Sequence, residues 1–399
     1  MVLLSSIRSI SVIETFHSNF FEVLCAFGAN LMLCCAGFTA SASGFLIPQL
    51  EDPSTGFRIT TDEGSWMASI NLIGSLTGAI FGAVLSDKIG RRSSLILDST
   101  LFTIGTLLTA FAINLEMILA GRFIQGHSTQ SAMVSAPMYT CEISQPKVRK
   151  YTGLFPVLCW DIGIAVSYLL GASLPWRYAI GMTIIAPITC FILLIICPES
   201  PTWLMFKCGE DEARKALIKL RGHKNMDNDI IIQEEFERIL LNKELKEEQE
   251  SVLKRVKSMF DPTFVKPFSF LMVLTIVGVL LCGGPIISYY KVPLLLEAKI
   301  QFDPYWTSAW MASFRAIMSC LALPFIGRFM KRTVHFFCSG ILIIGLLSLS
   351  AFTYFLDVLE DYDFARWIPI LAILLIYASH SFGRESIIFA LQVSMDTTM

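Results

Sequence analysis

Charged residues are scarce in this sequence. Asp, Glu, Lys and Arg make up 16% of its 399 residues, and the formal net charge is only -2. Soluble domains carry about 25% charged residues, so the scarcity excludes a water-soluble enzyme. A nucleic-acid partner needs a clustered excess of Lys and Arg, which this composition does not supply. Apolar residues are abundant instead, at 54% with a mean hydropathy of +0.61, and they predict a polytopic membrane protein.

Paired cysteine motifs are also missing. The eleven cysteines lie mostly within or beside apolar runs, and no CxxC pair occurs, so zinc or redox chemistry is not expected. The sequence also lacks a recognisable nucleophile, metal cluster or phosphate-binding loop. We therefore expect no enzymatic activity, no metal and no cofactor.

Apolar runs long enough to cross a bilayer recur along the chain. A hydrocarbon core about 30 Å thick needs roughly 20 mostly apolar residues per helix. Ten spans are predicted, over residues 22–48, 65–86, 95–113, 117–139, 151–172, 177–197, 267–290, 305–326, 334–356 and 367–391. The first run is too long, and lies too close to Glu14 and Glu22, to be a cleaved signal peptide.

The charges of the short loops predict the orientation. One alternate set of loops is basic, with Lys88, Arg91, Arg92, Lys147, Arg149, Lys150, Arg328, Lys331 and Arg332. The other set is acidic, with Glu51, Asp52, Asp62, Glu63, Asp357, Glu360, Asp361 and Asp363. Because basic loops stay on the cytoplasmic side, we expect both chain ends inside the cell.

The charge pattern also predicts the domain organisation. The segment 198–265 is long and highly charged, and apolar residues recur at helical spacing within it at Ala213, Ala216, Leu217 and Leu220 and again at Ile232, Phe236, Ile239 and Leu240. We expect two amphipathic helices beneath the membrane. The predicted units are a cytoplasmic N-terminus (1–21), a six-helix bundle (22–197), a cytoplasmic helical loop (198–265) and a C-terminal bundle (266–399).

Several motifs in one order resemble the sugar porter family of the major facilitator superfamily. They are Asp87-Lys88-Ile89-Gly90-Arg91-Arg92, Gly121-Arg122-Phe123-Ile124-Gln125-Gly126, Pro137-Met138-Tyr139 with Glu142 and Arg149, and Pro198-Glu199-Ser200-Pro201-Thr202-Trp203-Leu204. Ser65-Trp66 and the helix from Ala213 to Gly222 are similar to the insect facilitative trehalose and glucose transporters. The resemblance implies an all-α fold of major facilitator type that carries a sugar across the bilayer by alternating access, with the substrate between two halves.

The charged motif residues are expected to form a cytoplasmic latch. Carboxylates there can accept from guanidinium groups and from the amides at helix starts, and such contacts would hold the two bundles together. The latch candidates are Asp87, Gly90, Arg91, Arg92, Glu142, Arg149, Glu199, Arg328 and Arg332. An alternative is that Arg91 and Arg92 only fix the orientation. Gly74, Gly78 and Gly82 lie on one helical stripe, which favours close helix packing.

Asp161 is the strongest substrate-site candidate, because an ionisable group inside a membrane is costly and often functional. Its carboxylate could accept hydroxyl hydrogen bonds from a sugar stacked on Trp160, or it could couple transport to protons, or it could be a buried acid paired with Arg122 or Arg315. The substrate-binding candidates are Gln125, Trp160, Asp161, Ser288, Tyr289, Tyr290 and His380. Other ionisable groups within spans are His127, Arg384 and Glu385, whereas Arg122 and Arg315 favour a structural pairing role.

Span seven departs from the resemblance. Where the family carries an amide-rich Q-Q-L-S-G-I-N stretch, this chain reads Val279-Leu280-Leu281-Cys282-Gly283-Gly284-Pro285, and Val157 replaces a Gln in span five. Losing these amides should change sugar recognition, so the substrate need not be an ordinary hexose. Gly283, Gly284 and Pro285 also predict a kinked helix. In span ten the family's G-P-x-P-W segment is Gly383-Arg384-Glu385-Ser386-Ile387, and Gly327 replaces the Asp of the second basic motif.

Three functional hypotheses follow. The leading one is a facilitative sugar carrier of the trehalose and hexose class in the plasma membrane, with a small-molecule substrate and the lipid bilayer as partners. The family continues for two more spans after the tenth, so the C-terminal bundle is expected to have four helices. A transport-incompetent, truncated relative acting as a sensor or partner is therefore one alternative, and a proton-coupled symporter that uses Asp161 is the other. The oligomeric state stays open.

Overall fold

The computed structural model describes residues 2–52, 59–222, 230–247, 284–297, 302–326, 331–355 and 367–381, together with residues 269 and 273. Regular structure among these residues is helical throughout. Each of the ten predicted spans overlaps a helix of the described part of the chain.

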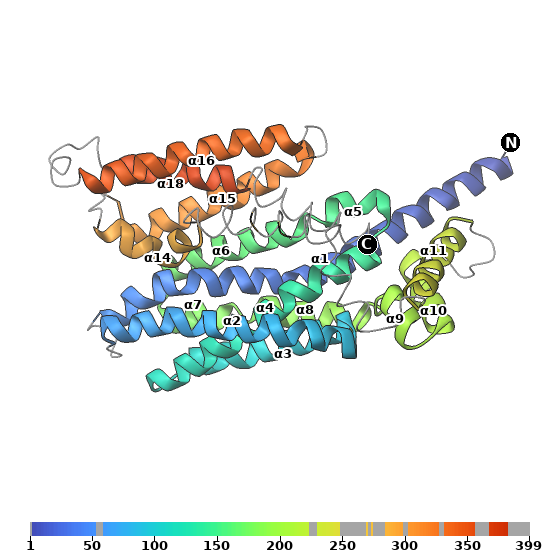
Figure 1. The fold of residues 1–399 in the computed structure, drawn as a ribbon, viewed down its shortest axis with the longest axis horizontal. Helices are drawn as coiled ribbons and strands as arrows, with labels where there is room; N and C mark the ends of the chain where they lie inside the picture. The colour runs from blue at the N-terminus through green and yellow to red at the C-terminus, as the bar shows by residue number, and fades with distance from the viewer. Residues whose placement is uncertain are drawn as a thin grey trace.

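Eight helices form the first half of the molecule (Figure 1). They are α1 (Val2–Glu51), α2 (Thr61–Ile89), α3 (Arg91–Ala110), α4 (Leu115–Ile143), α5 (Pro146–Thr152), α6 (Phe155–Ser173), α7 (Trp176–Met182) and α8 (Ile185–Ile196). In this half α4 contacts α1, α2 and α3, and α1 contacts α6 and α8. Helix α1 begins at Val2, well before the predicted start of the first span, and extends past the bundle beside α10 and α11 (Figure 1).

The charged loop forms three helices at one end of the first half. They are α9 (Pro201–Lys207), α10 (Glu210–Arg221) and α11 (Ile230–Glu247). Their apolar faces meet in a small core of Met205, Ala213, Leu217, Ile232 and Phe236. Both predicted amphipathic helices are therefore present, with the predicted faces buried.

The second half consists of α14 (Gly284–Glu297), α15 (Pro304–Ile326), α16 (Lys331–Tyr354) and α18 (Ile368–Ser379). It lies along one side of the first half, with α15 packed on α6 and α14 packed on α1 (Figure 1). The predicted kink at Gly283 to Pro285 falls at the edge of the described residues. Within α14 the backbone instead departs from helical geometry at Tyr290, with φ -120° and ψ 22°.

Large apolar side chains cover much of the outer surface. Leu76 and Phe81 of α2 and Phe337 and Leu347 of α16 are each more than 60% exposed. In water such surface would drive association, whereas hydrocarbon solvates it at no cost. Six of the described helical segments are long and apolar enough to cross a bilayer: Phe20–Glu51, Thr61–Ile89, Arg91–Ala110, Phe155–Ser173, Trp176–Ile196 and Thr333–Tyr354.

Candidate functional site: two clusters of buried charge

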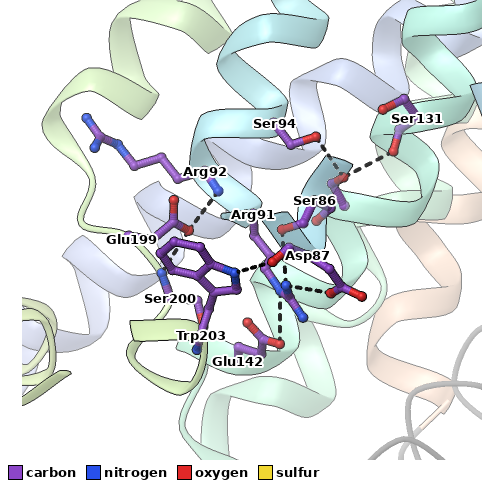
Figure 2. A network of polar contacts seen from close by, with 11 residues as sticks. Ser86, Asp87, Arg91, Arg92, Ser94, Ser131, Glu142, Glu199, Ser200 and Trp203 are labelled. Atoms are coloured by element: carbon purple, nitrogen blue, oxygen red, sulfur yellow. Dashed lines mark hydrogen bonds and ion pairs between the residues drawn. The ribbon is translucent and has the colours of Figure 1, made fainter. Parts of the chain in front are cut away.

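A network of charged side chains joins α2, α3, α4 and α9 (Figure 2). Arg91, the first residue of α3, pairs with Asp87 at 2.8 Å and with Glu142 at 3.3 Å. Its Nη1 also donates to the backbone oxygen of Ser86 at 3.1 Å. The indole Nε1 of Trp203 donates to the backbone oxygen of Asp87 at 3.0 Å. One arginine therefore fixes the corner between α2 and α3 and links it to α4.

Glu199 caps the start of α3. Its carboxylate accepts from the backbone nitrogens of Arg92 at 2.8 Å and Ser93 at 3.3 Å, and from that of Ser200 at 3.0 Å. Backbone amides at a helix start have no partner within the helix and attract negative charge. Gly90 allows this arrangement, because its φ is +100° and a Cβ there would overlap the Glu199 carboxylate.

Glu142 lies just beyond the predicted end of the fourth span and is a partly buried member of the network. Burial raises the pKa of its carboxyl above the ordinary value, and the nearby Arg91 guanidinium opposes that rise. Burial has the larger effect. Protonation of Glu142 would weaken its pairing with Arg91.

The remaining latch candidates have different positions. Arg149 donates to the backbone oxygen of Ser144 at 3.0 Å. Arg328 lies outside the described residues, and the side chain of Arg332 is not among those described. Within the described part of the chain, the network's contacts join elements of the first half and α9. A latch between the two halves stays a prediction.

Arg221 forms a separate charged cluster near this network, and the sequence did not predict it. Arg221, at the end of α10, pairs with Glu22 of α1 at 2.8 Å and with Glu235 of α11 at 2.5 Å, and it donates to the backbone oxygen of Ile143 at 3.1 Å. Arg221 is 2% exposed and Glu22 is fully buried. A basic residue in the last turn of an amphipathic helix resembles an ordinary helix-end charge, so its sequence position gave no signal.

The glycine stripe of α2 faces α4. A Cβ at Gly74 would overlap the backbone of Phe123, one at Gly78 the backbone of His127, and one at Gly82 the residue Ser131. The absence of side chains therefore allows the two helices to approach closely. His127 belongs to this contact too, because its Nδ1 lies 2.9 Å from the Thr77 hydroxyl.

Asp161 lies at the contact between the two halves. Its Oδ1 lies 2.6 Å from Nε of Arg315 on α15, and its Oδ2 accepts from the hydroxyls of Ser319 and Ser381, the latter at 3.2 Å. Asp161 is fully buried and Arg315 is 3% exposed. Of the three roles considered for Asp161, pairing with Arg315 is the one that these contacts realise, and the pair joins α6 of one half to α15 of the other.

Lys291 is a second buried charge at this contact, and it too was missed. It is fully buried on α14, one residue after the kink, and its Nζ lies 4.0 Å from the ring centre of Tyr168 and 4.8 Å from that of Tyr377. The predicted end of span seven at 290 made Lys291 look like a flanking charge. The available signal was the apolar run Val292 to Leu296, which continues the helix beyond it.

Arg122 is fully buried on α4 and faces α1. Its Nη2 donates to the backbone oxygen of Thr39 at 3.1 Å and to the Ser43 hydroxyl at 2.6 Å. Gln125, one turn along α4, donates to the Thr106 hydroxyl of α3 at 3.2 Å. The structure therefore directs Gln125 toward α3, away from the contact between the halves.

The remaining substrate-site candidates differ in how far their side chains are buried. Trp160 is partly buried and packs against the apolar cluster formed by α6, α14 and α15. His380 is buried at the end of α18, and Tyr290 is 41% exposed. The backbone of Tyr289 lies close to Gly44 of α1. The side chain of Ser288 is not among those described, and Arg384 and Glu385 lie outside the described residues.

Asp98 is another buried acid that the sequence did not single out. Asp98 of α3 is 1% exposed, and its Oδ2 accepts from the hydroxyl of Ser131 on α4 at 2.9 Å. An acidic residue one turn inside an apolar run was the signal that could have identified it. The contact with Ser131 links α3 to α4 within the first half.

A family model described as "Sugar (and other) transporter" matches residues 23–396. Among curated relatives, a facilitated trehalose transporter Tret1-2 homolog of Drosophila sechellia is 28% identical over 366 residues, which are 92% of this chain and 74% of that protein. A facilitated trehalose transporter Tret1 of Culex quinquefasciatus is 27% identical over 371 residues, 92% of this chain and 69% of that protein.

Solved structures share the fold. The major facilitator superfamily proton:xylose symporter XylE bound to 6-bromo-6-deoxy-D-glucose aligns with a TM-score of 0.75 at 18% identity, covering 95% of this chain and 82% of that one. The partially occluded, inward-open form of XylE from E. coli aligns with a TM-score of 0.73 at 17% identity, covering 94% and 87%. The predicted all-α fold of major facilitator type is confirmed.

Proposed function

Because this chain belongs to the sugar (and other) transporter family, an integral membrane family of carriers and not of enzymes, we propose that it carries sugars of the trehalose and hexose class by facilitated diffusion. The observation that carries the proposal is the match over residues 23–396, which includes both halves and the contact between them. Relatives named as facilitated trehalose transporters supply the substrate class.

The arrangement of the halves supports alternating access. Side chains of α6 and α15 meet at the Asp161–Arg315 pair, in the first half of α6 and at the middle of α15. A rocking motion of one half against the other must rearrange this contact, whereas the α2–α3 network can move as a rigid part of the first half. A solute bound between the halves would therefore be exposed alternately to either side.

Orientation and membrane are part of the proposal. The basic α2–α3 junction and the charged helices α9 to α11 lie at the same end as the start of α1 (Figure 1). Because basic residues favour the cytoplasmic side, the N-terminus would be cytoplasmic. The plasma membrane is the expected location for a carrier of extracellular sugar.

The test is uptake into liposomes that contain the purified full chain. We expect saturable uptake of labelled trehalose or glucose that stops when inside and outside concentrations are equal and is unaffected by a proton ionophore. Protein-free liposomes are the blank. Correctly inserted protein that takes up neither sugar would overturn the proposal.

The same assay separates the proton-coupled alternative. Asp161 is paired with Arg315 and accepts from two hydroxyls, so protonating it would break a buried ion pair. Uptake that rises with an inward proton gradient and loses that response in Asp161→Asn would favour symport instead. Glu116→Gln makes the matched change at an exposed acidic residue of α4 and should leave uptake unchanged.

A further inference from the structure

Lys291 is a fully buried lysine that contacts no carboxylate among the described residues. Its Nζ contacts two aromatic rings, Tyr168 of α6 and Tyr377 of α18, and lies 3.4 Å from the backbone oxygen of Ser308 on α15. Within the described residues these neighbours are all uncharged. Three helices from both halves thus surround one ammonium group.

A buried ammonium group lowers the stability of the folded protein. Burying an ammonium ion costs several kcal/mol in proteins, whereas a desolvated cation–π contact returns about 2 kcal/mol. Ionisable groups inside membranes are usually paired or functional. The aromatic rings orient Lys291 but do not replace a counter-ion, so a ligand that supplies negative charge would be strongly favoured.

The surrounding charges further favour a negatively charged ligand at Lys291. Arg315 lies over the same Tyr377 ring, with Cζ 5.4 Å from its centre, so it adds positive charge beside Lys291. Among the described residues, Asp161 is the buried carboxylate at this contact, and it is already engaged by Arg315. The contact between the halves therefore has more buried cations than carboxylates among the described residues.

Arg122 extends the positive region through α1. Its Nε and Nη1 have no hydrogen-bond partner among the described residues, while Nη2 binds Ser43. The next residue, Gly44, lies directly against the hydroxyl of Tyr168, whose ring faces Lys291. Two incompletely satisfied cations thus lie on either side of one turn of α1.

Polar groups suited to a carboxylate are also present. The Ser308 hydroxyl is buried and has no partner among the described residues, and its own backbone oxygen is the group near Lys291. A carboxylate can accept from an ammonium and a hydroxyl together, and charge-assisted bonds of this kind are the strong ones. The span-seven amides expected for neutral sugar recognition are absent from the sequence.

We propose that Lys291, with Ser308 and the Tyr168 and Tyr377 rings, binds the anionic group of a polyhydroxylated carboxylate, so that sugar acids are substrates of this carrier. The inference rests on the proposed carrier function and extends its substrate class to sugar acids. Neutral sugars would bind without the charge contact and hence more weakly.

The experiment uses the full chain in liposomes with labelled glucuronate as the probe, and glucose and trehalose as neutral references. We expect saturable glucuronate uptake that increases when the interior is made electrically positive, because the transported solute is an anion. Lys291→Met should reduce glucuronate uptake about 10- to 100-fold, and Lys291→Arg should retain part of it. Lys215→Met removes a lysine that is exposed on α10 and should change nothing.

Folding and ligand class are checked on the same variants. Glucuronate should raise the unfolding temperature of the wild type and of Lys215→Met but not of Lys291→Met. Equal glucuronate uptake by Lys291→Met and wild type would overturn the proposal even if that variant folds. If chloride or phosphate alone produces the Lys291-dependent stabilisation, the site takes inorganic anions and the assignment of a sugar acid is wrong.

The neutral references keep the two proposals separable. Uptake of glucose or trehalose without glucuronate uptake would leave the carrier function standing and refute the anion site. Uptake of glucuronate without either neutral sugar would support the anion site and refute the neutral substrate class. Uptake of none would refute both.

Discussion

The α2–α3 network and the charged cluster at the contact between the halves differ in the sign of their excess charge and in origin. At the α2–α3 network, Arg91 faces Asp87 and Glu142, and all three belong to the first half. At the contact between the halves, Arg315 of the second half pairs with Asp161 of the first, and Lys291 contacts no carboxylate among the described residues. An ion-pair network within one half suits a rigid corner. An excess of buried cations between the halves suits a contact that opens, closes and admits a charged solute.

The difference should be clearest when one carboxylate is neutralised in each cluster. Asp161→Asn leaves Arg315 buried without its partner, which should lower the free energy of unfolding by about 3 kcal/mol. Asp87→Asn alters a pair in which the Asp87 side chain is 69% exposed, so it should cost no more than about 1 kcal/mol. Thermal unfolding of the purified variants in detergent measures both. Equal losses would show that the two clusters do not differ as described.

The network's rigidity can be tested at its glycine. Gly90→Ala should destabilise the protein by about 2 kcal/mol, because alanine is strained at φ +100° and its Cβ would displace the Glu199 carboxylate. Gly209→Ala is the matched control, since φ there is +103° and nothing lies within 4 Å of the added Cβ. The excess loss in Gly90→Ala measures the helix cap alone. Equal losses would mean that the Glu199 contact contributes nothing.

The smallest expected effect is a pH dependence at Glu142. Its raised pKa means that the folded state favours the protonated carboxyl, so its stabilising contribution is full below the unfolded-state pKa and is lost as pH rises through the folded-state pKa. Relative to Glu142→Gln, the wild type should therefore be more stable in acid than at neutral pH. Unfolding temperatures across that range give the comparison. An unchanged difference would mean that burial does not dominate at Glu142.

Helix positions followed from hydropathy because a membrane span needs a long apolar run whatever its neighbours are. The loop helices followed from the spacing of Ala213, Leu217, Ile232 and Phe236, and their faces are buried as predicted. Both patterns are local. Contiguous motifs were informative for the same reason, since Asp87 and Arg91 are four residues apart and pair across the corner between α2 and α3.

The contact between the halves could not be predicted in the same way. Asp161 and Arg315 are 154 residues apart, and the sequence left Arg122 and Arg315 as equal partners for the acid. Only the packing of α15 on α6 decides between them. Lys291 was overlooked because a lysine at the end of an apolar run is usually a flanking charge, and its burial depends on Tyr168 and Tyr377 from two other helices.

A double-mutant cycle on Asp161→Leu and Arg315→Met tests most directly whether these side chains join the two halves. Each single change should leave one buried charge unpaired, whereas the double change replaces the pair by apolar side chains. We predict that the double variant is more stable than the sum of the single losses implies, by about 2 kcal/mol or more. Strictly additive losses would show that Asp161 and Arg315 do not interact and would contradict the proposed junction.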